Sequence, residues 1–153
     1  VFLGELLRYL WVARIPGVQV LKPEVDASGY DLVLSLGKVM RHVQLKASMH
    51  DGKAAHQPIH AALGEHASGC VVWIVLNDDL SFERFRWFGA GPGQALPALS
   101  TFRRAKHNLA NAEGVKKERV HTWRVPKSAF DTVPDMAGLI EKLFGESARA
   151  APL

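Results

Sequence analysis

The stretch GYDLVLSLGKVMRHVQLKAS, residues 29–48, predicts two apolar strands joined by a tight turn at Gly37-Lys38. Glycine at the first position of a two-residue turn is typical of a type II′ hairpin. The turn predicts strands over about 30–36 and 39–47, with paired residue numbers that sum to 75. In this register Asp31 lies opposite Gln44, and a slip of one residue would move every side chain to the other face.

Three polar side chains, Asp31, Gln44 and Lys46, share one face of this hairpin. Opposed side chains approach within about 5 Å, and Lys46 lies roughly 6–7 Å further along its strand. The Asp31 carboxylate and the Gln44 amide are hard oxygen ligands suited to Mg²⁺ or Mn²⁺, and the Leu45 carbonyl can add a third oxygen. A lysine ammonium can orient and acidify a water or stabilise charge on a phosphate. The group therefore predicts metal-assisted phosphodiester hydrolysis.

The rest of the chain alternates between helical and strand patterns. Periodicity predicts helices over 2–13, 58–67, 98–112 and 135–144, and strands over 18–22, 70–76, 81–89 and 118–125. This order predicts an α/β fold with a central mixed β-sheet flanked by helices.

The spacing of Asp31 and, thirteen positions later, Gln44-Leu45-Lys46 resembles the PD-(D/E)XK nuclease superfamily, in its Q-x-K variant. The resemblance covers about residues 2–76 and implies a restriction-endonuclease-like core of order αβββαβ, here with C-terminal αβα additions. It also implies a nuclease in which Asp31 and Gln44 hold the metal and Lys46 acts on the nucleophile. Glu5 would complete the site through a water.

Two departures from that family's pattern are visible. No Pro-Asp dipeptide precedes the turn, and Pro23-Glu24 is the nearest equivalent. Gln44 is neutral, so the site has one negative charge fewer and weaker metal binding is expected. A catalytically inactive nuclease-fold module that binds nucleic acid or a protein therefore stays open as an alternative.

The charge of the chain permits an anionic partner. The net charge is +4 and the pI about 9.4, which allows nucleic acid binding without requiring it. The densest basic region is expected to contact phosphates, DNA in preference to RNA, although a solvated helix face is the plain alternative. The residues expected to make these contacts are Arg103, Arg104, Lys106, Lys116 and Lys117, and the same region also contains His107 and Arg119.

Length and composition fit one domain, expected over residues 1–147, with a flexible tail over 148–153. The single cysteine, Cys70, excludes an intrachain disulfide and fits a reducing compartment, so a cytoplasmic location is expected. No apolar run is long enough to span a bilayer, and no membrane partner is expected.

Alternation in the aromatic strand predicts Phe82 and Phe88 on one face and Phe85 and Trp87 on the other. If one face is exposed, it can serve as a partner surface. A homodimeric assembly domain is therefore a third interpretation.

Overall fold

The computed structural model describes residues 1–24, 28–107 and 109–149. The helices and strands, in chain order, are α1 (Phe2–Val12), β1 (Gln19–Leu21), β2 (Leu32–Leu36), β3 (Val39–Met49), β4 (His56–His60), β5 (Gly69–Leu76), β6 (Phe82–Gly89), β7 (Arg103–Lys106), β8 (Glu118–Pro126), β9 (Asp131–Val133) and α2 (Met136–Phe144). Short 3₁₀ turns occupy Ala61–Glu65, Leu99–Thr101, Lys127–Ala129 and Gly145–Ala148. Within the described ranges, no helix is long and apolar enough to cross a membrane.

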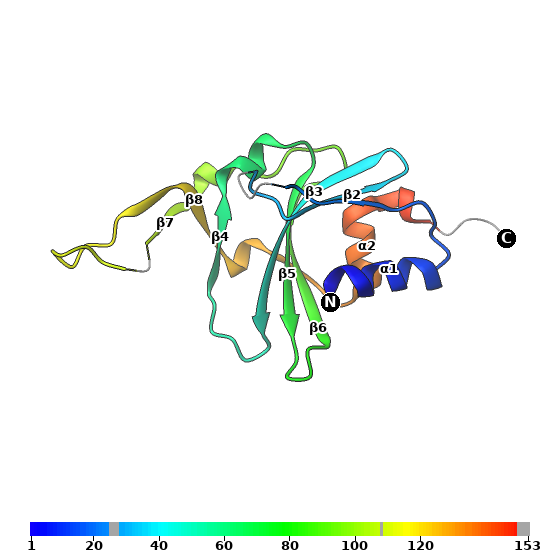
Figure 1. Cartoon of the computed structure of the whole chain (residues 1–153), viewed down its shortest axis with the longest axis horizontal. Coiled ribbons are helices and arrows are strands. Elements are labelled where there is room, and N and C mark those ends of the chain that lie inside the picture. Colours follow the sequence, from blue (N-terminus) through cyan, green and yellow to red (C-terminus); the bar gives the residue numbers. More distant parts are fainter. Residues whose placement is uncertain (25–27, 108, 150–153) are drawn as a thin grey trace.

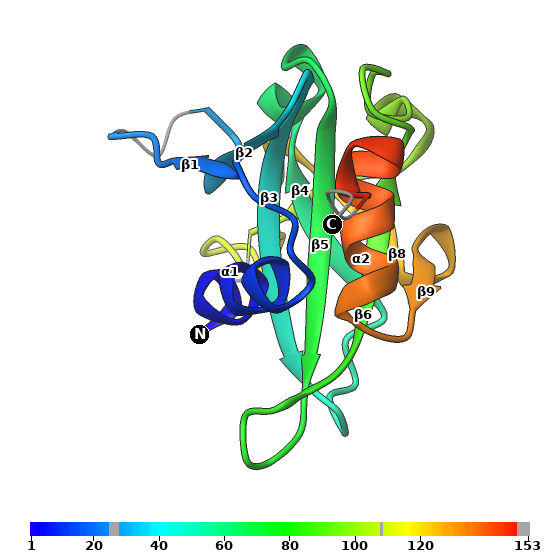
Figure 2. The ribbon, with the colours of Figure 1, turned by 90° about the vertical axis from the view of Figure 1, so that its right-hand side faces the viewer.

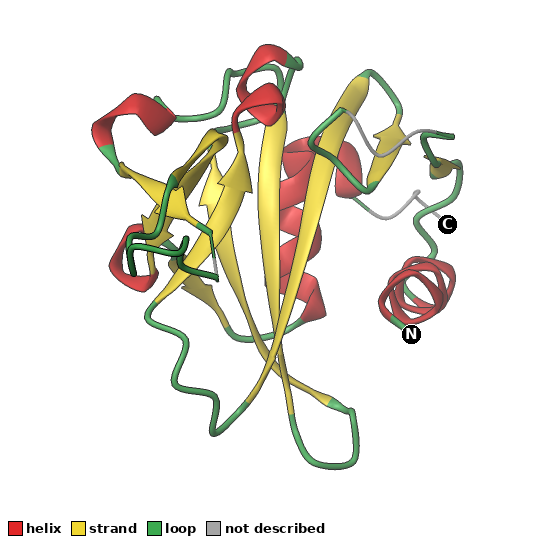
Figure 3. Cartoon of the chain, turned by 60° about the vertical axis from the view of Figure 1, so that its left-hand side comes forward, coloured by secondary structure: helices red, strands yellow, loops and turns green. Residues whose placement is uncertain are grey.

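Two sheets pack against each other in the described part of the chain. The central six-stranded sheet has the order β1-β2-β3-β5-β6-β9, and β3 and β5 are parallel while the other neighbours are antiparallel. This mixed sheet confirms the predicted α/β class. A smaller antiparallel sheet has the order β4-β8-β7. Helices α1 and α2 lie on one side of the central sheet and the small sheet lies on the other (Figures 1, 2 and 3).

The predicted hairpin register is confirmed. Leu36 pairs with Val39 and Leu32 pairs with Val43, so paired numbers sum to 75. Gly37 has a φ of +58°, the left-handed value that the first residue of a type II′ turn requires and that glycine adopts without steric cost. The turn residue and the apolar alternation therefore fix which side chains face which sheet surface.

Strand β5 is buried on both faces, as its unbroken apolar sequence predicts. Cys70 and Val72 pack in the cluster that includes both helices, whereas Val71 and Trp73 pack against the small sheet. Burial raises the pKa of the Cys70 thiol to about 12. Cys70 is therefore a small core residue with no reactive thiolate near neutral pH.

The helix predicted over 58–67 is wrong, because residues 56–60 form strand β4 and only a 3₁₀ turn follows. β4 is an edge strand of the small sheet, a place where a proline without an N–H is tolerated. Gln57 and Ile59 are buried, and His56, Pro58 and His60 alternate with them. This strand and turn make the crossover between parallel strands β3 and β5 that the sequence assigned to a helix.

The helix predicted over 98–112 is also wrong. Residues 103–106 are strand β7, and Leu109, expected in the core, is 85% exposed. The Arg104 guanidinium lies 4.4 Å from the Trp123 ring centroid, so a cross-strand contact replaces the helix. Gly114, with φ +78°, turns the chain back into β8. The local helical period was overridden by pairing with a strand distant in sequence.

The predicted dimer surface on the aromatic strand is wrong. A bulge between Val75 and Leu76 shifts the register with β6, so Phe82 lies on the same face as Phe85, with ring centroids 5.4 Å apart. Phe85, Trp87 and Phe88 are buried, and β6 is paired on both edges. These rings are core residues of this chain. The predicted tail lies largely in residues 150–153, outside the described residues.

Candidate active site

The predicted group of polar residues lines one cavity of about 280 Å³. Asp31 precedes β2, and Gln44, Leu45 and Lys46 belong to β3. The opposite wall comes from the small sheet, and the remaining lining residues are Gly29, Tyr30, Pro58, His60, Arg119 and Thr122. The structure therefore places the carboxylate, the amide and the lysine on the same side of the central sheet, as the hairpin register predicted.

Backbone contacts fix the position of Asp31. Its N–H donates to the Val43 carbonyl at 2.8 Å, and its Oδ2 accepts from the Leu45 N–H at 2.5 Å. In an extended strand the N–H and C=O of one residue point to the same edge, so the Leu45 carbonyl faces the Asp31 side. Gly29 has φ +74°, and a Cβ there would lie 2.9 Å from the Leu63 nitrogen. Only glycine lets the chain pass this closely and deliver Asp31 to the cavity.

Gln44 carries an unpaired buried oxygen. Its Oε1 is shielded from solvent and has no hydrogen-bond partner among the described residues. Leaving such an acceptor unsatisfied costs about 1–3 kcal/mol. A cation bound beside the Asp31 carboxylate would relieve that cost.

The oxygen ligands fit a hard cation with few protein ligands. In the described ranges, no group of three or more His, Cys, Asp or Glu residues is placed to hold a metal. The available donors are the Asp31 carboxylate, the Gln44 Oε1 and the Leu45 carbonyl, all oxygens. Mg²⁺ commonly binds through one or two carboxylates and keeps several waters, so this set fits Mg²⁺ or Mn²⁺ and not a thiolate or imidazole metal.

Lys46 is half-buried beside groups of both signs. Burial lowers the pKa of Lys46, Arg119 lowers this pKa further, and Asp31 opposes both by raising it. Arg119 belongs to β8, and its place in the cavity follows only from the way the small sheet packs over β3. Sequence reasoning included Arg119 in a basic region but did not connect it to Lys46.

His60 is a cavity residue that the sequence did not assign to the site. Its Nδ1 accepts from the Ala62 N–H at 3.1 Å, and its ring stacks with His121 at a centroid distance of 6.2 Å. The mistaken helix hid this placement, because it gave His60 the wrong backbone direction. Gln57 lies on the buried face of β4 and alternates with His60.

Glu5 requires a correction. Helix α1 packs on the face of the central sheet opposite to the cavity, and Glu5 Oε2 accepts from the Arg8 guanidinium at 2.8 Å. Glu5 lines a separate cavity together with Phe82 and Met136. The structure therefore does not bring Glu5 to Asp31, and no water-mediated role at the site follows from its position.

The five predicted phosphate contacts do not line the cavity; they lie on the β7–β8 hairpin, which projects from the body of the molecule (Figure 1). Residues 103–124 hold seven Lys and Arg against two Glu, while the rest of the chain holds twelve against thirteen acidic residues. In the part of the chain that the structure describes, no ion pair involves a lysine or arginine of this hairpin. The positive charge of the protein is thus concentrated on an arm that begins beside the cavity.

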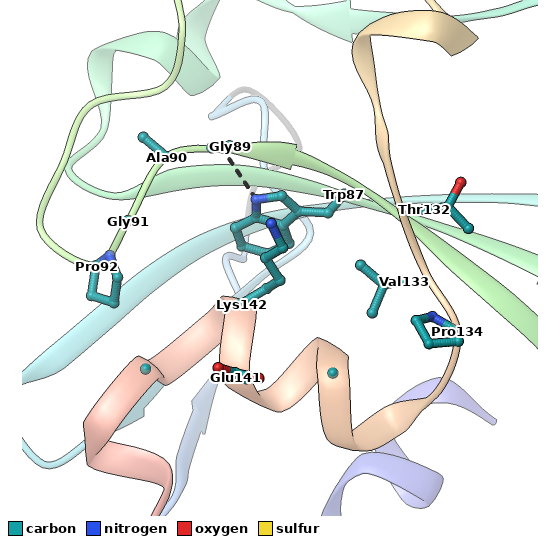
Figure 4. Close-up of a pocket in the computed structure, with 12 residues that line it drawn as sticks. Trp87, Gly89, Ala90, Gly91, Pro92, Thr132, Val133, Pro134, Glu141 and Lys142 are labelled. Carbon is teal, nitrogen blue, oxygen red and sulfur yellow. Dashed lines mark hydrogen bonds between the residues drawn. The ribbon is translucent and has the colours of Figure 1, made fainter.

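A larger cavity of about 540 Å³ lies between the end of β6 and α2 (Figure 4). Its charged residues are Glu141 and Lys142, and Lys142 is engaged with the Asp131 carboxylate at 3.0 Å. The Trp87 indole donates to the Gly89 carbonyl at 3.2 Å, shown by the dashed line. Its acid, Glu141, is exposed, and no unpaired lysine, arginine or histidine accompanies it among the described lining residues, so this cavity is a weaker candidate for chemistry.

No family model matches this chain, and no curated protein matches it. Among solved structures, the chain is similar to a bacterial homing endonuclease, I-Ssp6803I. The match has 20% sequence identity and a TM-score of 0.30, and it covers 74% of this chain and 83% of that chain. A likeness of this level supports no inference about function, which must come from the cavity itself.

Proposed function

We propose that this chain is a metal-dependent nuclease of the PD-(D/E)XK type that hydrolyses phosphodiester bonds, with DNA preferred over RNA. The observation that carries the proposal is the cavity in which Asp31, Gln44 and Lys46 meet, with the Gln44 Oε1 left unpaired. The basic hairpin beside this cavity supplies the charge that a polyanionic substrate needs.

The proposal assigns roles in the cavity to Asp31, Gln44, Leu45 and Lys46. The Asp31 carboxylate, the Gln44 Oε1 and the Leu45 carbonyl would hold Mg²⁺ or Mn²⁺, and the ion would supply Lewis acidity at the phosphate. Lys46 is near Asp31 and Arg119. Its ammonium orients the attacking water and stabilises the charge that develops on the phosphate. The hairpin residues Arg103, Arg104, Lys106, Lys116 and Lys117 guide the nucleic acid backbone.

The test is cleavage of plasmid DNA, single-stranded DNA and RNA with Mg²⁺ or Mn²⁺ and with EDTA. Lys46→Met and Asp31→Asn are each expected to reduce the cleavage rate by about 10²–10⁴-fold. Lys38→Met, in the exposed turn of the same hairpin, is the matched control and should cleave normally. Metal-dependent activity that survives both cavity substitutions would refute the proposal.

A second candidate function is a nuclease-fold module that binds nucleic acid without cleaving it. The observation that favours it is the single carboxylate among the metal-binding oxygens of the cavity. This candidate expects salt-sensitive nucleic acid binding that is unchanged by EDTA and by Lys46→Met, together with no cleavage by the wild-type protein.

A further inference from the structure

The cavity contains a second group of donors that the proposed metal ligands do not use. Lys46 and Arg119 both line it, and their only charged counterpart among the described lining residues is Asp31. With the lysine protonated, the cavity therefore carries one excess positive charge. Lys46 is half-buried and Arg119 is exposed, and an anion of one negative charge that enters the cavity would balance this excess.

His60 adds a neutral donor whose tautomer is set by the backbone. Its Nδ1 accepts the Ala62 N–H at 3.1 Å, so that nitrogen holds a lone pair and no proton. In a neutral imidazole the other nitrogen, Nε2, must then carry the hydrogen. The ring is held by stacking on His121. His60 is therefore oriented to donate through its Nε2–H.

We infer that Lys46, Arg119 and the Nε2–H of His60 form a phosphate-binding subsite in this cavity. The ligand class is a phosphate group with at least one free anionic oxygen, and in the proposed function it is the phosphodiester of the substrate, so that identification rests on the proposed function. Arg119 offers the planar donor pair that suits phosphate oxygens. His60 acts as a substrate-binding residue that donates a hydrogen bond through its Nε2–H.

The subsite also gives a reason for the position of the basic hairpin next to the cavity. Arg119 lies on β8, one strand of the basic hairpin, and also lines the cavity. A backbone that follows the hairpin charges would meet Arg119 before it reaches Lys46. The hairpin then aligns successive phosphates with the subsite.

The experiment is a titration of the whole chain with inorganic phosphate in EDTA, followed by NMR of the histidine side-chain nitrogens. The wild-type protein is expected to show His60 as the Nε2–H tautomer, and its Nε2 resonance should shift as phosphate binds. Arg119→Gln and His60→Asn are each expected to weaken phosphate binding roughly tenfold. The asparagine oxygen can still accept from the Ala62 N–H, so His60→Asn removes the Nε2–H donor and keeps the cap.

Lys38→Gln, in the exposed turn between β2 and β3 and outside the cavity lining, removes one positive charge elsewhere; it is the matched control and should bind phosphate as the wild type does. An Nδ1–H tautomer for His60, no phosphate binding, or equal binding by all variants would overturn the inference. The titration contains no metal and measures no cleavage. If the wild type binds phosphate and Arg119→Gln and His60→Asn lose that binding, the subsite is supported even if the protein cleaves no nucleic acid. If the protein cleaves nucleic acid but the Arg119 and His60 variants bind phosphate as the wild type does, the nuclease proposal stands and the subsite is overturned.

Discussion

The amide of Gln44 is the residue on which the character of the site depends. Its oxygen is buried, and no described residue pairs with it, although an apolar residue could replace the amide side chain at lower cost. Retaining an unsatisfied acceptor beside a carboxylate is expected where a ligand supplies the missing contact. Neutrality at this position also makes the proposed metal affinity lower than that of a site with two acids.

Gln44→Glu is expected to tighten metal binding, because it adds a negative charge without a large change of shape. The Mg²⁺ concentration for half-maximal cleavage should fall by roughly tenfold. A metal titration of cleavage rates for the two proteins measures this shift. Gln44→Leu removes the amide oxygen and should need a much higher Mg²⁺ concentration for half-maximal cleavage. If neither variant changes this concentration, Gln44 is not a metal ligand.

Lys46→Met is expected to stabilise the fold near neutral pH while removing activity. Burial lowers the folded-state pKa of Lys46 below its usual value, so the folded state penalises the ammonium. That penalty is fully present below the folded pKa and disappears as pH rises above the unfolded pKa. The gain is about 1 kcal/mol or less, since solvent screens part of the side chain. Urea melts at pH 7 and pH 11 should show the stability difference between the two proteins shrinking at the higher pH.

Among the elements, α2 is joined to the end of β6 by one buried arginine. Arg41, on β3, is 0% exposed. Its guanidinium donates to the carbonyls of Leu143 at 2.8 Å, Lys142 at 2.9 Å, Ala90 at 3.0 Å and Gly91 at 3.2 Å. These contacts satisfy carbonyls at the C-terminal end of the helix, where no intrahelical donors remain. Arg41 therefore holds the helical layer against the central sheet.

Arg41→Met is expected to lower the free energy of unfolding by about 3 kcal/mol, because it leaves several carbonyls without donors. Arg8→Met is the control, since Arg8 forms only an exposed pair with Glu5 and should cost under about 0.5 kcal/mol. Urea denaturation of both variants measures the difference. Equal losses would show that the buried contacts of Arg41 contribute little.

In the whole molecule, the two sides of the central sheet have different roles. The helical side of the central sheet buries the larger apolar cluster. The other side carries the cavity. The projecting β7–β8 hairpin also lies on that side (Figure 1). Hydrogen bonds at the hairpin tip, from His107 N–H to the Lys117 carbonyl and from Asn111 N–H to the Val115 carbonyl, are both 2.9 Å. These two hydrogen bonds join the two sides of the hairpin near its tip.

The double variant Lys116→Gln/Lys117→Gln is expected to weaken nucleic acid binding without changing the melting temperature. Both lysines are exposed, and removing two phosphate contacts should reduce the slope of log K against log salt by up to about two. Fluorescence anisotropy with a short DNA duplex at several salt concentrations gives this slope. An unchanged slope would exclude the hairpin tip from the binding surface.

The amino-acid sequence alone determined the hairpin that brings Asp31 opposite Gln44. The glycine turn and the alternation of apolar residues in the strands each depend on only a few residues that are adjacent in the sequence. The same local rules predicted β5, β8 and α2, whose patterns agree with their final surroundings.

Only the tertiary structure decided the small sheet, because its strands gain their partners from residues far apart in sequence. Proline at position 58 and the periodicity near 103 favoured helices locally, and cross-strand pairing between β4, β8 and β7 outweighed them. That pairing placed His60 and Arg119 in the cavity, and the packing of α1 on the far face kept Glu5 away from it. A pattern in one segment cannot encode which distant segment covers it, and burial against that segment supplies the deciding free energy.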